Sequence, residues 1–218
     1  MIKLVHYLYV LSSWSFVAED AVLEARQTFG EALEYDWRIA VTDYGGEGCF
    51  AKEQLQFYYD RLEVATGRHM NLEWWRPGYD WLVPDRVVAA ARLLGSDNSD
   101  VRLALAKAGL QDGIEITDLS NAAEIASAAS GLSVSSILKM ANNAPTAVCL
   151  FEWRREFLAS GVSLRPAFQI TNDLGDRVVL SGIWNAGPLI SAIDALLTDE
   201  RSYHDFVRER AARATVSR

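Results

Sequence analysis

The chain has 218 residues, half of them hydrophobic, so it can bury a substantial core as one domain or as a domain with a large insertion. Its formal net charge of −8 argues against a general affinity for nucleic acid or for an anionic membrane, because both repel an acidic surface. Two cysteines, Cys49 and Cys149, lie far apart in sequence, which excludes a disulfide framework and a Cys-x-x-Cys pair. No apolar run reaches the ~18 residues of a membrane span. We therefore expect a cytoplasmic protein with a small-molecule substrate.

The first forty residues predict a βαβ unit. Residues 2–10 are apolar and rich in β-forming types, which favours a buried strand over the apolar part of a secretory signal. Apolar residues then recur at helical spacing between 18 and 29, and strict alternation from 35 to 41 predicts a second strand. In a parallel βαβ unit the helix begins beside the C-terminal end of the first strand. We therefore expect Ser12 and Ser15 at a binding edge.

A long helical block follows, from about residue 51 to residue 161. Glycines separate its segments, as they commonly do where helices end. Pro84 and Pro145 suit the first turn of a helix, and Thr117 and Ser133 are candidate N-caps. The segments have similar lengths, but their residues do not repeat, so the sequence predicts no solenoid.

The last part of the chain predicts a β-hairpin, a helix from about 187 to 197, and an arginine-rich solvated helix or tail at 201–218. The order β-α-β, helices, β-β-α is that of a thioredoxin fold with a helical insertion, which belongs to the α/β class. We expect a discontinuous thioredoxin-like domain at 1–50 and 161–200, interrupted by an all-helical domain at 51–160.

Several stretches resemble the DsbA-like thioredoxin superfamily, which includes predicted disulfide isomerases, FrnE-like proteins, kappa-class glutathione transferases and 2-hydroxychromene-2-carboxylate isomerases. HYLY followed by SSWS is similar to the first strand and the Cys-x-Trp-Cys motif of that superfamily, with both cysteines changed to serine. YVLSSWSF also aligns on the kappa-class pattern, in which a serine opens the helix. LVPDRVVAAARLL and LALAKAGLQDGIEITDLSNAAEIASAASGLS resemble the helical insertion, and GVSLRPAFQI resembles the segment that carries the cis-proline, here Pro166.

The two serines limit the chemistry of this site. A helix N-terminus stabilises a cysteine thiolate, whereas a serine hydroxyl ionises far too reluctantly, and two hydroxyls cannot exchange electrons as a dithiol and a disulfide do. Ordinary dithiol–disulfide chemistry is therefore excluded here. The resemblance implies that Ser12 donates a hydrogen bond to the sulfur of glutathione or another thiol, with Ser15 beside it in the catalytic site. The alternative is that both serines only cap the helix, which stabilises by ~1 kcal/mol.

Arg165 and Pro166 extend the expected site. In the similar loop, the cis-proline exposes the backbone of the preceding residue to the ligand, and that residue is Arg165 here. We infer an anion subsite formed by Ser12, the amides after it at Ser13 and Trp14, and the guanidinium of Arg165. The alternative is an arginine that pairs with a surface acid.

Other candidates are less specific. Gly45 and Gly46 follow the second strand in a loop that borders the site in relatives, although a glycine pair there can also be only a turn. Trp81 ends an aromatic-rich stretch, EWWRPGYDW, that could wall a pocket or pack the inserted helices. Cys49 could be a nucleophile if the pKa of its thiol were lowered, or an inert filler. The three histidines have no partners at ligand spacing, so we predict no metal site.

The leading hypothesis is a redox-inactive DsbA-like isomerase or transferase that acts on a small, partly aromatic organic substrate, with glutathione or another thiol as its cofactor. One departure counts against glutathione: kappa-class enzymes carry a Ser-Asp pair near the final helix, and the corresponding stretch here reads LSGIWNAGPLISAID. The alternatives are a non-catalytic protein that binds a small molecule or a protein, and a thiol oxidoreductase that uses Cys49. A homodimer is compatible with the sequence.

Overall fold

A computed structural model describes residues 1–41 and 50–216 of the chain. It contains a four-stranded sheet in the order β2-β1-β3-β4. The strands are β1 (Ile2–Leu8), β2 (Leu33–Ile39), β3 (Ala167–Thr171) and β4 (Arg177–Ser181). β1 and β2 are parallel, whereas β3 is antiparallel to both β1 and β4. The predicted βαβ unit and the predicted hairpin therefore share one mixed sheet, with β1 at its centre.

Helices account for most of the remaining described chain. They are α1 (Ser13–Val17), α2 (Glu19–Phe29), the 3₁₀ turn η1 (Gly30–Ala32), α3 (Lys52–Thr66), α4 (Val83–Leu93), α5 (Asp100–Leu110), α6 (Leu119–Ser130), α7 (Val134–Ala141), α8 (Ala144–Ala159) and α9 (Ala186–Val216). No helix of the described residues is long and apolar enough to cross a membrane.

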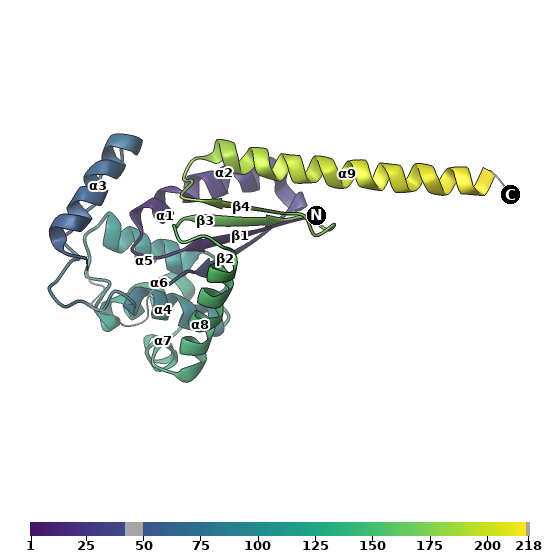
Figure 1. The fold of residues 1–218 in the computed structure, drawn as a ribbon. Coiled ribbons are helices and arrows are strands. Elements are labelled where there is room, and N and C mark those ends of the chain that lie inside the picture. Colours follow the sequence, from purple (N-terminus) through teal and green to yellow (C-terminus); the bar gives the residue numbers. More distant parts are fainter. Residues whose placement is uncertain (42–49, 217–218) are drawn as a thin grey trace.

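Both faces of the sheet are covered, which explains why β1 is apolar almost throughout. On one face, Ile2, Leu4 and Phe168 are buried beneath α2 and α9, which run along the sheet in Figure 1. On the other face, Tyr7 packs against Phe157 of α8, with 5.5 Å between the ring centroids. Alternate side chains of β1 thus enter two different cores.

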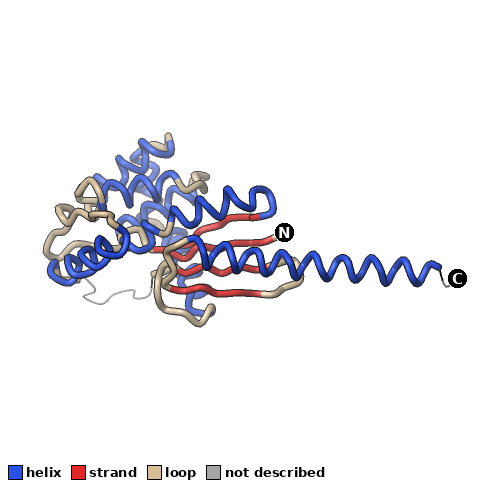
Figure 2. The backbone as a smooth tube through the Cα atoms, turned by 90° about the horizontal axis from the view of Figure 1, so that it is seen from above, coloured by secondary structure: helices blue, strands red, loops and turns tan. Residues whose placement is uncertain are grey.

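Helices α3–α8 lie between β2 and β3 in sequence and form the helical insertion (Figures 1 and 2). Helix α4 is central to it, because residues 87–91 of this helix are all buried and α4 contacts α5, α6, α7 and α8. This arrangement confirms the predicted fold class, a thioredoxin fold with an all-helical insertion.

Most helix ends follow the expected residues. Pro84 and Pro145 lie in the first turns of α4 and α8, and Ser133 caps α7 by accepting a hydrogen bond from the N–H of Ser136. The predicted N-cap Thr117 is wrong by one residue. Asp118 caps α6 instead, because its carboxylate accepts a hydrogen bond from the N–H of Asn121 at 2.9 Å.

Two helices differ in length from the prediction. The single helix expected up to Gly30 is divided at Ala18 into the five-residue α1 and the longer α2. The last helix, expected at 187–197 and followed by a separate solvated helix or tail, is one continuous helix of 31 residues. Both differences matter for the surfaces described below.

Candidate functional site

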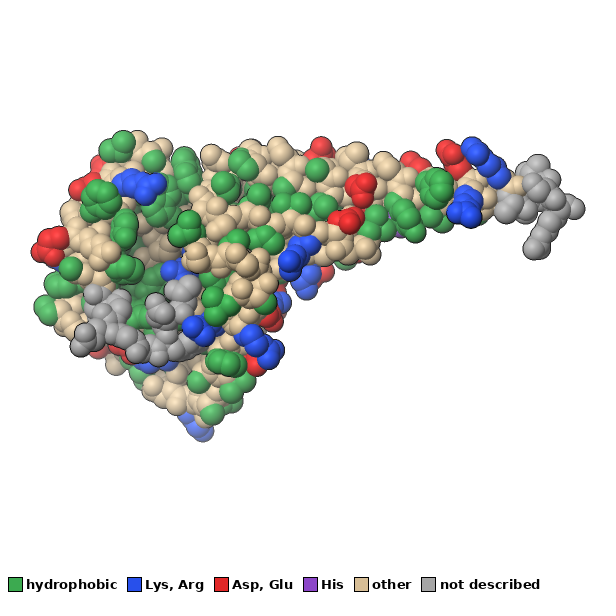
Figure 3. Space-filling view, viewed as in Figure 1, with side chains coloured by type: hydrophobic (Ala, Val, Ile, Leu, Met, Phe, Trp, Pro, Cys, Tyr) green, Lys and Arg blue, Asp and Glu red, His purple; other side chains and the backbone are tan. Residues whose placement is uncertain are grey.

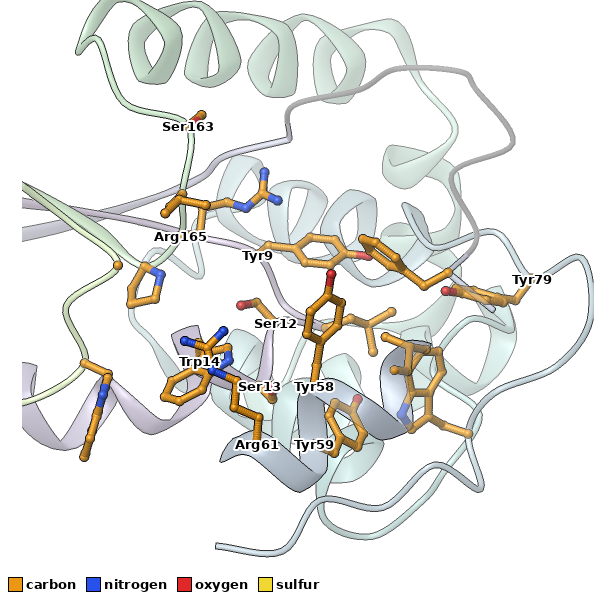
Figure 4. Close-up of a pocket in the computed structure, with 18 residues that line it drawn as sticks. Tyr9, Ser12, Ser13, Trp14, Tyr58, Tyr59, Arg61, Tyr79, Ser163 and Arg165 are labelled. Carbon is orange, nitrogen blue, oxygen red and sulfur yellow. The ribbon is translucent and has the colours of Figure 1, made fainter. Parts of the chain in front are cut away.

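A cavity of about 470 Å³ opens where β1 passes into α1 (Figure 4). Its walls come from the connection between β1 and α1, from α3, from the aromatic-rich stretch before α4, and from the loops that flank the β3–β4 hairpin. Small-molecule sites in proteins commonly measure about 300–1,000 Å³ and are lined by aromatic residues with a few polar groups. The cavity has the size and the composition of such a site.

Ser12 lines this cavity and is also the N-cap of α1. Its Oγ accepts a hydrogen bond from the backbone N–H of Ser15 at 3.2 Å. The capping role considered for Ser12 is therefore real. It leaves a second role open, because a hydroxyl oxygen that accepts one hydrogen bond still has its own hydrogen to donate. An acceptor atom of a ligand in the cavity is within the reach of that hydrogen.

The short α1 contributes only a small positive potential. Its macrodipole is the sum of few aligned peptide units, because the helix ends at Ala18 after five residues. The attraction for an anion that was expected from a long first helix therefore depends mainly on nearby cationic side chains.

Arg165 supplies one of these cations and lies on the cavity wall as expected. The Arg165–Pro166 peptide bond is cis, in agreement with the expectation for Pro166. The guanidinium of Arg165 donates a hydrogen bond to the carbonyl of Ala40 at 2.8 Å and lies 5.7 Å from the ring centroid of Tyr9. The arginine is thereby held at the cavity by both a hydrogen bond and a cation–π contact.

Arg61 of α3 supplies a second cation, which was not predicted from the sequence. Its guanidinium lies 5.8 Å from the ring centroid of Trp14, and both side chains line the cavity (Figure 4). No carboxylate of the described chain forms an ion pair with Arg61. The cavity thus has one arginine from the loop before β3 and another from the helical insertion.

Aromatic rings make up much of the wall. They belong to Tyr9, Trp14, Phe50, Tyr58, Tyr59, Trp74, Tyr79 and Trp184. Trp14 and Trp184 lie 6.2 Å apart between ring centroids, and Trp74 meets Tyr79 edge to face at 5.3 Å. Burial raises the pKa of Tyr9 and of Tyr59 above that of a free phenol, so both hydroxyls stay protonated at neutral pH. Flat apolar groups would stack or pack favourably here.

Two of the predicted site residues lie outside the cavity lining. Ser15 is in the third position of α1, where its side chain turns into the core and its Oγ has no hydrogen-bond partner among the described residues. Trp81 lies behind Tyr9, at 5.4 Å between ring centroids, and its carbonyl accepts a hydrogen bond from the Tyr9 hydroxyl at 3.3 Å. Trp81 therefore supports the wall instead of forming it.

Three other candidates, Gly45, Gly46 and Cys49, lie outside the residues that the structure describes. The other cysteine, Cys149, is half-buried on α8 and does not line the cavity. Burial raises the pKa of its thiol, so it lacks the lowered pKa of a reactive cysteine. Within residues 1–41 and 50–216, no cluster of three or more His, Cys, Asp or Glu side chains is placed to hold a metal.

A buried carboxyl group lies next to the cavity wall. Asp85, in the first turn of α4, is fully buried, and its Oδ1 accepts a hydrogen bond from the backbone N–H of Val10 at 3.2 Å. Burial raises the pKa of Asp85 to about 8, against the opposing effects of the Val10 hydrogen bond and the charge of Arg165. Asp85 thus fixes the chain just before Ser12 and is protonated at neutral pH.

The contributions of α3 and of Trp184 to the cavity were not predicted from the sequence. Tyr58 and Arg61 lie one helical turn apart, which places them on one face of α3, but a sequence does not show which part of the fold that face meets. Trp184 lies in the stretch LSGIWNAGPLISAID, which had drawn attention only because a Ser-Asp pair is missing from it. The presence of a tryptophan in this stretch, where kappa-class enzymes have a polar Ser-Asp pair, could have indicated an aromatic wall.

The different positions of Ser12 and Ser15 can be tested by thiol labelling. In a chain with Cys49 and Cys149 changed to serine, we expect Ser12→Cys to react with iodoacetamide at roughly the rate of a free thiol. Ser15→Cys should react about a hundredfold more slowly, because its side chain is buried and labelling requires local opening. Mass spectrometry of the modified protein over time measures both rates. Equal rates would contradict the placement of Ser15.

No protein-family model and no curated protein matches the sequence. Solved structures do match over nearly the whole chain. A candidate protein disulfide isomerase from Nitrosomonas europaea gives a TM-score of 0.72 at 16% identity, covering 93% of this chain and 98% of that one. The cytosolic disulfide reductase DsbM from Pseudomonas aeruginosa gives 0.68 at 17% identity, covering 94% and 99%. DsbA from Pseudomonas aeruginosa gives 0.61 at 13% identity, covering 94% and 86%.

At such identities the likeness concerns the fold, because function depends on the residues of the site. The strand order, the inserted helices and these structural neighbours agree. The chain therefore has a DsbA-like thioredoxin fold, in which Ser12 and Ser15 lie at the turn from the first strand into the first helix.

Proposed function

We propose that this protein is a redox-inactive DsbA-like enzyme, an isomerase or transferase that acts on a small, partly aromatic organic substrate together with glutathione or another thiol. The observation that carries the proposal is the position of Ser12, whose hydroxyl lines a cavity of about 470 Å³ that also contains Arg165 and the cis peptide bond before Pro166. These features support a thioredoxin-type site that works without thiols of its own.

Ser12 is the proposed catalytic residue. Its oxygen accepts the N–H of Ser15, and its hydrogen would be donated to the sulfur of the thiol. A hydrogen bond from a neutral donor stabilises a thiolate relative to a thiol and so lowers the pKa of the sulfur. The thiol supplies a nucleophile when it is bound, and the protein supplies its position and its ionisation state.

The other residues of the cavity fit a thiol cofactor with acidic groups. Arg61 and Arg165 could pair with carboxylates, which a guanidinium binds through two parallel hydrogen bonds. The structure of DsbM from Pseudomonas aeruginosa with GSH matches this chain with a TM-score of 0.64 at 16% identity. The aromatic walls would hold the organic substrate next to the sulfur. Because the Ser-Asp pair of kappa-class enzymes is missing, the two arginines are the proposed replacement for that anchor.

Calorimetric titration with reduced glutathione tests the proposal. We expect binding by the wild-type protein and an affinity at least about tenfold lower for Ser12→Ala, because the variant loses a hydrogen bond to a charged group. Ser12→Ala also removes a helix cap, so a control with the same defect is needed. Ser133→Ala is suitable: Ser133 accepts the N–H of Ser136 at 3.2 Å, as Ser12 accepts that of Ser15, but it is not among the residues that line the cavity.

The outcomes separate the competing functions. Weaker binding by Ser12→Ala with unchanged binding by Ser133→Ala supports the proposal and justifies a screen of glutathione-dependent isomerisations and transfers. Equal affinity of wild type and Ser12→Ala would contradict the role of Ser12. An absence of binding by the wild-type protein would contradict glutathione and favour a binding protein, whose Ser12 only caps α1.

A further inference from the structure

The second half of α9 extends beyond the body of the protein. In the first half, Leu189, Ile193 and Leu196 are buried against α2 and the sheet. From residue 201 to residue 211, every side chain is exposed. Figures 1 and 2 show that residues 201–216, here named the C-terminal arm, project past the end of the sheet. The arm is thus a helix without the tertiary packing that stabilises most helices.

The arm carries an apolar face. Tyr203, Phe206 and Val207 are 51%, 58% and 44% exposed, and their spacing of three and four residues places them together on one side of the helix. Tyr203 follows Leu196 after seven residues, so this face continues the one that packs on the sheet. Figure 3 shows hydrophobic side chains gathered on the underside of the arm. Apolar surface of this kind on a projecting helix indicates a partner.

The charge of the arm defines the kind of partner. The arm contains four arginines against Asp205 and Glu209, a net charge of +2, and with Arg218 the residues 201–218 carry +3. Because the whole chain has a net charge of −8, residues 1–200 carry −11. Two arms repel each other, whereas an arm and the body of another copy attract each other. The acidic body of a second copy is therefore a partner whose charge is complementary to that of the arm.

The outer face of α3 matches the arm. Glu53, Phe57, Asp60 and Val64 share this face, opposite the side of α3 that is buried, and Phe57 and Val64 are 63% and 90% exposed. The face thus combines two large apolar residues with two acidic ones and no basic residue. Tyr203, Val207 and Arg210 of the arm follow one another at four and three residues, the same spacing as Glu53, Phe57 and Asp60 of α3.

We propose that the protein forms a two-fold symmetric dimer in which the C-terminal arm of each copy packs on the outer face of α3 of the other. With the two helices parallel and Val207 against Phe57, Asp60 falls next to Arg210. Because the dimer is two-fold symmetric, it contains two equivalent contacts between an arm and α3. The opposite side of α3 lines the cavity, so the dimer also holds one wall of the functional site in place.

Sedimentation equilibrium of the full chain measures the proposed dimer. We expect a mass of twice 24.2 kDa for the wild-type protein and a dissociation constant at least about tenfold higher for Phe206→Ser, a truncation of an aromatic contact residue. Val148→Ser provides the control, because Val148 is an exposed apolar residue on the outer side of another helix, α8. Circular dichroism verifies that each variant stays folded.

A charge exchange tests the location of the contact. Arg210→Glu and Asp60→Arg should each weaken the dimer, and the double variant should restore it, because the opposite charges meet again. A monomeric wild-type protein would overturn the proposal. A dimer that Val148→Ser weakens as much as Phe206→Ser does would also overturn it, as would a double variant no tighter than the single ones, since the arm would then bind elsewhere.

Discussion

Replacement of Arg102 by methionine is expected to lower the free energy of unfolding by about 3–5 kcal/mol. Arg102 of α5 is only 3% exposed, and its guanidinium donates to Glu19 of α2 at 2.9 Å and to the hydroxyl of Tyr35 at 2.8 Å. The substitution would leave the carboxylate of Glu19 without its cationic partner in a mostly buried place, which is costly because few water molecules can solvate it. Urea denaturation at pH 7 measures the loss.

The large loss of stability expected for Arg102→Met should arise because the ion pair is buried, and not merely because an ion pair is lost. Arg86→Met is the control, because Arg86 pairs with Asp80 at 2.7 Å on the surface, where such pairs contribute about 0–1 kcal/mol. The double variant Glu19→Gln, Arg102→Met should regain part of the loss, because it no longer buries an unpaired carboxylate. A loss for Arg102→Met no larger than that for Arg86→Met would contradict the buried network.

The same network shows what the fold requires from the chain. Glu19 and Tyr35 belong to the thioredoxin-like part, and Arg102 belongs to the insertion, so the ion pair connects the two. His6 lies beside them, where burial and then the charge of Arg102 lower the pKa of its imidazole well below the usual value. His6 is therefore neutral and structural, as expected from its place in the first strand.

The fold could be predicted from the sequence because its signals are local. β1 and the hairpin have strand-like patterns, the motif around Ser12 marks the first strand-to-helix turn, and Pro166 marks the loop before β3. The continuity of α9 was also readable, since residues 188–216 contain no glycine or proline after Pro188 that would end a helix. The arginine-rich composition drew attention to a tail and obscured that continuity.

The candidate site was predictable only in part. Ser12, Trp14, Arg165 and Pro166 lie next to motifs, and the structure brings them together at one cavity. Arg61 is different. It lines the cavity only because of the way α3 packs on the rest of the fold, and tertiary packing of this kind cannot be read from the sequence. The same holds for Ser15 and Trp81. Trp14 and Tyr79, one and two residues before them, line the cavity, whereas the side chain of Ser15 is buried in the core and Trp81 lies behind Tyr9.

Asp85→Asn is expected to change how the stability of the protein depends on pH. An aspartate in the unfolded chain has a pKa near 3.9, and that of Asp85 in the folded protein is about 8. Between these values the folded state holds one proton more than the unfolded state. The free energy of unfolding therefore falls as the pH rises, by about 1.4 kcal/mol per pH unit from this group, and the loss is complete above pH 8.

Asparagine imitates the protonated carboxyl group, because it keeps an oxygen for the Val10 N–H and cannot ionise. Urea denaturation of both proteins from pH 5 to pH 8.5 should give a stability difference in favour of Asp85→Asn that grows with pH to several kcal/mol. Asp85→Ala separates the effect of the charge from that of the hydrogen bond. Like Asp85→Asn, it should not show the loss of stability with rising pH that Asp85 causes in the wild type. It should nevertheless be less stable than Asp85→Asn at every pH, because the N–H of Val10 loses its acceptor. A constant difference between wild type and Asp85→Asn would mean that Asp85 is already ionised in the folded protein, with a negative charge behind the wall of the cavity. That negative charge would repel an anion bound beside Ser12. The proposed binding of an anionic ligand therefore requires that Asp85 is neutral in the folded protein.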